Sequence, residues 1–125
     1  MSRRVARERT FSQADFDAFA ALSGDNNPIH VDPDFSAHTR FGRTVAHGAL
    51  LCSVLRGLVE ELVPGGRQVR QSTMYPAPSP AGEPLLFEAE TIGETPERVQ
   101  IRLLVTRQGD GEVTCRGETE VVPCR

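Results

Sequence analysis

Apolar residues recur at helical spacing along one segment of the chain, from Gly48 to about Val63. They would cover most of the circumference of a helix, and the charged residues gather toward its second half. A helix that is apolar on nearly all sides is typically buried. The sequence Pro64-Gly65-Gly66 then ends the pattern. We therefore expect one long buried helix over residues 48–63.

Beyond residue 66 the apolar positions change to the alternation that is typical of β-strands. The segments with this pattern are residues 67–75, 84–92, 97–107 and 112–122. Asp110-Gly111 favours a tight hairpin between the last two segments, and the proline-rich residues 76–82 fit a crossover between strands. Four strands after a buried helix predict an α+β fold, in which an antiparallel sheet packs against that helix.

Shorter elements are predicted before the long helix. Residues 4–11 fit an edge strand. Ser12 is a good N-cap with an acidic residue three positions later, so a helix is expected over about residues 13–22. Asp32-Pro33 predicts the start of a second, shorter helix. Residues 38–46 are expected to form a loop that returns to the body of the protein.

The turn after the first predicted helix carries a carboxylate and an imidazole, Asp25 and His30. In an extended chain they would lie up to about 17 Å apart. Pro28 fixes its own φ and pushes Asn27 toward an extended backbone, so the chain bends and Asn27 is expected to lock the turn. A carboxylate and an imidazole around one water can act as a general acid–base pair. The simpler alternative is that Asp25 only forms the turn.

Gly48 opens the long predicted helix and is preceded by His47. The first N–H groups of a helix are unpaired and carry the positive end of its dipole, so they can bind a negatively charged oxygen. Glycine would let a thioester carbonyl approach without a Cβ in the way. Gly48 can also be read as a merely permissive helix start. His47 is expected to orient this turn.

Composition narrows the classes of function. At 125 residues the chain is expected to form one domain, residues 1–125, without needing a metal or disulfide to fold. A net charge of −3 argues against a surface for nucleic acid or anionic membrane. Cys52, Cys115 and Cys124 have neither disulfide-framework nor zinc spacing. Without a signal peptide or a membrane-span pattern, a soluble cytoplasmic protein is expected.

Two motifs carry a family resemblance. Asp25-x-Asn27-Pro28-x-His30, followed by His47-Gly48-Ala49-Leu50, resembles the signature of the R-specific enoyl-CoA hydratases, which are MaoC-like dehydratases of the hot-dog fold. The resemblance implies an antiparallel sheet wrapped around one long helix, in agreement with the apolar pattern. It also implies a homodimer that acts on an acyl-CoA or acyl-carrier-protein thioester, in fatty acid metabolism, without metal or redox cofactor.

The resemblance further implies a reaction. Asp25 and His30 would activate a water that attacks C3 of a trans-2-enoyl thioester, while N–H groups around Gly48 polarise the thioester carbonyl. A proton returned at C2 completes a syn hydration to an R-3-hydroxyacyl-CoA. Asn27 and His47 would support this site.

The chain departs from the family pattern at one position. Members often carry a Ser nine residues after the His of the His-Gly pair, and here that place is Arg56. Ser53, one turn earlier, would take a supporting role. Arg56 beside the acyl tunnel would shorten it or pair with a substrate carboxylate, so we expect Arg56 to influence acyl specificity. Arg40 and Arg43 are either exposed or in contact with the phosphates of coenzyme A.

Two other functions remain open at this point. A hot-dog acyl-CoA thioesterase would use the same helix N-terminus, but it would need only one carboxylate, so that His30 would be surplus. A non-catalytic acyl-CoA-binding subunit would be consistent with Arg56 in place of the Ser. The pairing of Asp25 with His30 favours the hydratase.

Overall fold

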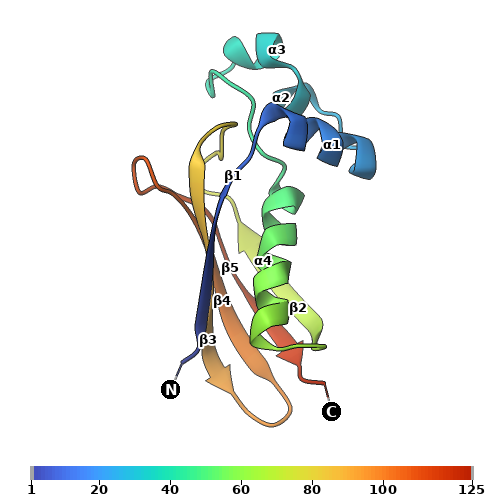
Figure 1. The fold of residues 1–125 in the computed structure, drawn as a ribbon, viewed down its shortest axis with the longest axis vertical. Helices are drawn as coiled ribbons and strands as arrows, with labels where there is room; N and C mark the ends of the chain where they lie inside the picture. Colours follow the sequence, from blue (N-terminus) through green and yellow to red (C-terminus); the bar gives the residue numbers. More distant parts are fainter. Residues whose placement is uncertain (1, 125) are drawn as a thin grey trace.

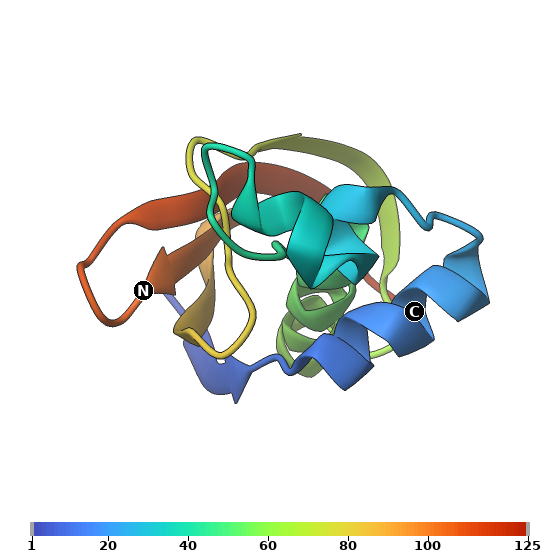
Figure 2. The same ribbon diagram turned by 90° about the horizontal axis from the view of Figure 1, so that it is seen from above.

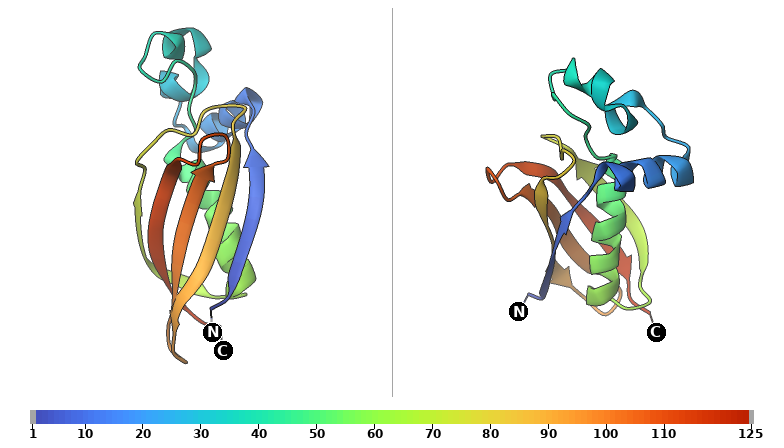
Figure 3. Two further views of the ribbon diagram at one scale, coloured as in Figure 1. Left: turned by 90° about the vertical axis from the view of Figure 1, so that its left-hand side faces the viewer. Right: turned by 45° about the horizontal axis from the view of Figure 1, so that its top comes forward.

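The long helix predicted over residues 48–63 is the axis of the fold. In the computed structural model, which describes residues 2–124, helix α4 spans Gly48–Leu62 and packs against an antiparallel five-stranded sheet (Figure 1). The sheet curves around the helix (Figure 3). Its strand order is β1-β3-β4-β5-β2. The strands are β1 (Arg4–Thr10), β2 (Arg67–Met74), β3 (Pro84–Glu94), β4 (Val99–Arg107) and β5 (Val113–Val122).

The core lies between α4 and the inner face of the sheet. Leu51, Leu55 and Leu58 of the helix are almost fully buried. They pack against residues of β3 and β4 that alternate with outward-facing ones, as expected of a sheet with one covered face. These inward residues are Leu85, Phe87, Ala89, Ile101, Leu103 and Val105. The opposite side of α4 is exposed at Ala49, Ser53 and Gly57 in the single chain.

Three short helices cover the end of the sheet at which α4 begins (Figure 2). They are α1 (Gln13–Ser23), α2 (Pro28–Val31) and α3 (Pro33–Ala37). The Ser12 side chain accepts a hydrogen bond from the Asp15 N–H, and the Asp15 side chain accepts one from the Ser12 N–H, which forms a capping box for α1. Gly24 ends α1 in the left-handed conformation, with φ of 83°.

Most of the predicted elements are confirmed. The hot-dog arrangement, the first helix, the strand near the N-terminus and the four later strands all form, with bounds that differ by a few residues. Helix α2 was not predicted, because we interpreted Pro28 only as a bend. None of the helices described for residues 2–124 is long and apolar enough to cross a membrane.

Candidate active site

The turn from Asp25 to His30 is built by its own side chains. Asn27 has an extended backbone, with φ of −53° and ψ of 132°, as expected before proline. Its side-chain oxygen accepts a hydrogen bond from the Ile29 N–H at 3.2 Å and so caps α2, in which Pro28 is the first residue. An Asp25 carboxylate oxygen accepts a longer one from the Asn27 N–H at 3.4 Å. The chain therefore folds back, and α2 carries His30 into the protein.

The fold brings Asp25, His30 and His47 together. A carboxylate oxygen of Asp25 and one ring nitrogen of each histidine all lie within 4.8 Å of one another. The two imidazole rings stack, with their centroids 3.8 Å apart and their planes at 24°. Both histidines are buried, whereas Asp25 is exposed. A carboxylate beside two imidazoles can transfer protons, and the same three groups can also ligate a metal ion.

Backbone carbonyl groups fix the tautomer of each histidine. His30 Nδ1 lies 2.8 Å from the Val45 carbonyl oxygen, and His47 Nε2 lies 2.8 Å from the Asp25 carbonyl oxygen. Because a carbonyl oxygen only accepts, these two nitrogens carry the ring protons. The lone pairs are therefore on His30 Nε2 and His47 Nδ1, and the latter is buried without a hydrogen-bond partner among the described residues. His30 is left with a free basic nitrogen.

Gln13 fixes the position of His30 from a third element. Its side-chain N–H donates to the His30 carbonyl oxygen at 2.8 Å, and its side-chain oxygen accepts from the Thr44 hydroxyl at 2.6 Å. The first residue of α1 is thereby tied to α2 and to the loop that leads into α4. Sequence analysis did not identify this role, since Gln13 is one more polar residue in the first turn of a helix.

Gly48 begins α4 directly after His47. The N–H groups of Leu50 and Leu51 bond to the His47 carbonyl oxygen, so the first N–H groups, at Gly48 and Ala49, stand at the open end of the helix. An ideal Cβ on Gly48 would lie only 2.6 Å from Cζ of Tyr75. A side chain at residue 48 would therefore displace the end of the Tyr75 ring from its present place.

A pocket of about 300 Å³ connects His30 with Gly48. Tyr75, Ser79 and Thr114 also line it. The hydroxyl groups of Ser79 and Thr114 are buried and have no hydrogen-bond partner in the structure. Such groups are costly unless a ligand or water satisfies them, so the pocket is suited to a partly polar occupant.

Sequence analysis did not identify Tyr75, Ser79 or Thr114. Thr114 has no partner in the β4–β5 register, because Thr106 pairs with Val113 and Val105 pairs with Cys115. It is thus the extra residue of a β-bulge, a feature that redirects a side chain and that no alternation pattern predicts. Tyr75 could have been noticed as the single tyrosine of the chain, at the start of the proline-rich crossover.

The other candidate residues lie outside this pocket or at its edge. Ser53 is exposed and donates to the Leu50 carbonyl oxygen of its own helix at 2.7 Å. Arg56 points toward the far end of α4, where it donates to the Gly66 carbonyl oxygen at 3.3 Å and pairs with Glu60 at 3.6 Å. Neither lines the pocket with His30.

The arginines of the loop before α4 take two different positions. Arg40 is exposed and lines the pocket, and its guanidinium lies over the ring of Phe41, 5.0 Å from the centroid. Arg43 forms an ion pair with Glu83 at 3.4 Å.

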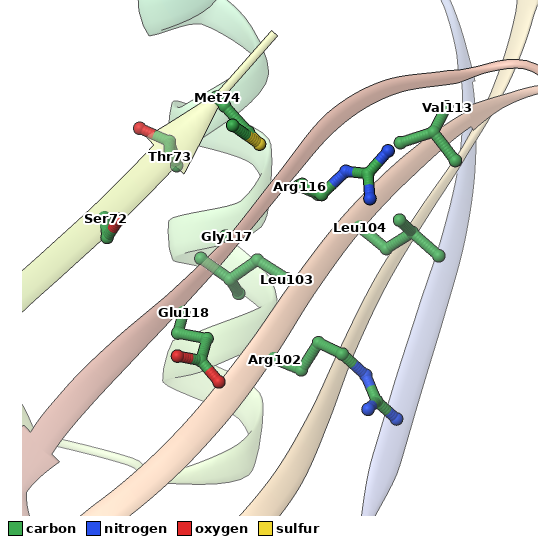
Figure 4. A pocket seen from close by; sticks show the side chains of 10 residues that line it. All are labelled: Ser72, Thr73, Met74, Arg102, Leu103, Leu104, Val113, Arg116, Gly117 and Glu118. Carbon is green, nitrogen blue, oxygen red and sulfur yellow. The ribbon is translucent and has the colours of Figure 1, made fainter. Parts of the chain in front are cut away.

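A second hollow, of about 430 Å³, lies on the face of the sheet turned away from α4 (Figure 4). Arg102, Arg116 and Glu118 line it, and all three are exposed. None of the candidate residues of the turn or of the α4 N-terminus takes part. The pocket beside His30 is therefore the better candidate for chemistry, although it is smaller.

Comparison with known proteins gives matches over most of the chain. A family model described as a MaoC like domain matches residues 1–113. The (R)-specific enoyl-CoA hydratase of Aeromonas caviae is 35% identical over 126 residues, which covers 97% of this chain and 92% of that protein. The 3-hydroxybutyryl-CoA dehydratase of Methylorubrum extorquens is 32% identical, over 91% of this chain and 74% of that protein. The solved structure of an (R)-hydratase from A. caviae involved in PHA biosynthesis matches with a TM-score of 0.90 at 31% identity, over 98% of this chain and 96% of that one.

Proposed function

Because the chain belongs to the MaoC-like dehydratase family, we propose that it is an R-specific enoyl-CoA hydratase, a hydro-lyase. It adds water reversibly to a trans-2-enoyl-CoA in a syn sense and forms an R-3-hydroxyacyl-CoA. The observation that carries the proposal is the cluster of Asp25 and His30, whose polar atoms lie within 4.8 Å, where the pocket leads to the N-terminus of α4. The names of the relatives support the same reaction.

Asp25 and His30 hold and deprotonate the attacking water. The water donates one hydrogen bond to the Asp25 carboxylate and the other to His30 Nε2, the nitrogen left basic by the Val45 carbonyl. Its oxygen bonds to C3 as the C2=C3 double bond breaks, and its proton is returned to C2 through the same pair. The sum is addition of H and OH across one double bond, with no net change in the protein.

The N-terminus of α4 stabilises the charge that develops during this addition. Electron density moves from C3 through C2 to the thioester oxygen, which becomes more negative in the transition state. The unpaired N–H of Gly48 and the positive end of the helix dipole face that oxygen. Preorganised donors of this kind act more strongly on the transition state than on the substrate.

His47 and Asn27 act as positioning residues. His47 holds the main chain of Asp25 through the 2.8 Å hydrogen bond to its carbonyl oxygen, and its ring stacks on His30. Asn27 caps α2 and so fixes the direction in which His30 enters the pocket. Both act through the catalytic pair rather than on the substrate.

Substrate selection is assigned to the arginines. Arg40, exposed at the pocket, binds the phosphates of the coenzyme A carrier. Arg56 limits the acyl chain or pairs with a carboxylate at its end, and its buried Nη1, which has no hydrogen-bond partner in the structure, supports this role. Ser53, one turn earlier on the exposed side of α4, supports the acyl site from there.

The functional unit is proposed to be a homodimer in the cytoplasm. Strand β2 lies at the edge of the sheet, with β5 on one side only; Val69 and Met74 are exposed along it, and Tyr75 is exposed directly after its end. Two copies can join their β2 edges into one continuous sheet. Cys52 and Cys115 carry free thiols, which suits a reducing compartment.

The test follows the absorbance of the conjugated thioester when the purified protein is mixed with crotonyl-CoA. We expect the absorbance to fall while the thioester stays intact, and chiral chromatography to show the R product. Release of free coenzyme A instead would identify a thioesterase. Absence of turnover with crotonyl-CoA, longer enoyl-CoAs and carboxylated enoyl-CoAs would contradict catalysis and favour a binding subunit.

A further inference from the structure

The phenol of Tyr75 occupies the space directly above the start of α4. An ideal Cβ on Gly48 would lie 2.6 Å from Cζ of Tyr75 and 2.9 Å from its hydroxyl oxygen. The hydroxyl end of the ring, and not its base, is therefore the part that packs on Gly48. The thioester oxygen must arrive at this same residue if the N–H of Gly48 is to bind it.

Tyr75 is held there by Cys52, which lies one helical turn after Gly48. The hydroxyl oxygen of Tyr75 and Sγ of Cys52 are 3.2 Å apart. Burial and the neighbouring Cys52 raise the pKa of Tyr75 to about 12, so the phenol keeps its proton at neutral pH. Hydrogen bonds from Cys115, Tyr75 and Gln71 lower the pKa of Cys52 to about 6, despite its partial burial, which makes its sulfur a better hydrogen-bond acceptor. Either atom of this pair can be the donor, and the protonated Tyr75 hydroxyl is able to donate to Cys52 Sγ.

Tyr75 is also accessible to a ligand. It shares the pocket of about 300 Å³ with His30 and Gly48, and 46% of its surface is exposed. A thioester bound with its oxygen at Gly48 and its double bond near His30 therefore passes beside the Tyr75 hydroxyl. Rotation of the O–H group about the C–O bond of Tyr75 would redirect its hydrogen bond from Cys52 Sγ to the thioester oxygen.

We propose that Tyr75 is a further catalytic residue, whose hydroxyl group donates a second hydrogen bond to the thioester oxygen beside the N–H of Gly48. Cys52 accepts this hydrogen bond while the site is empty, and the substrate oxygen replaces it. The proposal rests on the hydration reaction proposed above and specifies its carbonyl site. No covalent bond to Tyr75 or Cys52 forms, and no proton is transferred from either.

The first test is the variant Tyr75→Phe, which keeps the ring against Gly48 and removes only the hydroxyl group. Loss of one oxyanion donor costs about 10²–10³-fold in kcat, so we expect a fall of that order with crotonyl-CoA and an unchanged thermal unfolding midpoint. Full activity of Tyr75→Phe beside an active wild type would overturn the Tyr75 proposal alone. Failure of the wild type to hydrate any enoyl-CoA would instead overturn the proposed function.

The second test measures polarisation of the substrate without turnover. We expect Asp25→Asn to bind crotonyl-CoA and to hydrate it too slowly to disturb the measurement. Donors to the carbonyl of the bound thioester then shift the enoyl absorbance band to longer wavelength. Addition of Tyr75→Phe to this variant is expected to reduce the shift, whereas addition of Cys52→Ala, which keeps the phenol, is expected to preserve it. An equal loss of the shift in both double variants would show that Tyr75 and Cys52 act only as a structural pair and would contradict the proposal.

Discussion

At the scale of single residues, the candidate site consists of side chains whose remaining hydrogen-bonding capacity is set by backbone carbonyls. His30 and His47 each give one ring N–H to a carbonyl oxygen, of Val45 and of Asp25, and each keeps one lone pair. The motif predicted that Asp25 and His30 would meet, because they are only five positions apart and the chain bends at Pro28 between them. The close contact of His47 with both could not be predicted, since it depends on where α4 begins relative to α2.

The reactivity of the Cys52 thiol toward alkylation is expected to depend on pH in a defined way. Its pKa, lowered from 9.0 to about 6, means that the thiolate predominates at pH 7. The rate of alkylation by iodoacetamide at Cys52, followed by peptide mass spectrometry, should therefore rise through pH 6 and level off near pH 7. The thiolate also stabilises the folded state above the unfolded pKa near 9, and this contribution is lost as the pH falls through 6.

The matched control is Cys52→Ser, in which modification at this position disappears. Cys115 is fully buried and the hydrogen bond to Cys52 raises its pKa, so it should stay unmodified in the folded protein. An alkylation rate at Cys52 that keeps rising to pH 9, as for an ordinary thiol, would contradict the interaction of Cys52 with its donors.

At the scale of elements, the apolar pattern predicted the helix and strands well because each has one covered face. The helix over residues 48–63 and the strand over 97–107 agree with α4 and β4 to within two residues. The pattern could not predict α2, a single turn whose four residues show no periodicity. It also missed the bulge at Thr114, because one extra residue changes which side chains face the core without changing the composition of the strand.

Helix α1 is expected to depend on its N-terminal cap. Ser12→Ala removes the side chain that accepts from the Asp15 N–H, and loss of such a cap costs about 1 kcal/mol. We expect urea denaturation to show this loss and hydrogen exchange to show faster opening of α1. Ser12→Thr keeps a cap and should stay close to the wild type, so an equal loss in both variants would argue against the capping box.

At the scale of the whole molecule, the strand order β1-β3-β4-β5-β2 leaves β2 as a sheet edge beside the candidate site. Tyr75 directly follows β2, and its ring packs on Gly48. The pocket that these two residues line is therefore close to the β2 edge. From the sequence alone, association was expected from the small size of the chain, from the open sheet edges of a single hot-dog unit and from the family resemblance. The apolar residues Val69 and Met74 are exposed on β2, and this exposure is the reason that the proposed dimer is assigned to this edge.

A charge placed on this edge tests the proposed dimer. In a dimer joined through β2, Val69→Glu brings equal charges toward the twofold axis, and we expect light scattering to show the mass of a monomer. Ile92→Glu is the matched control, since Ile92 and Val69 are each 43% exposed but Ile92 lies on β3. Dimers in both variants would place the interface elsewhere, and monomers in both would point to a general effect of added charge.

The central claim, that Asp25 and His30 together activate the water, is tested most directly by crotonyl-CoA hydration in single variants with controls from the same segment. Asp25→Asn and His30→Ala should each lower kcat/KM by about 10²–10⁴-fold, the contribution expected of a general acid–base group. Asp32→Asn, which keeps a cap for α3, and His38→Ala, at an exposed position, should stay near the wild type. Retention of hydration in either Asp25→Asn or His30→Ala would contradict the account.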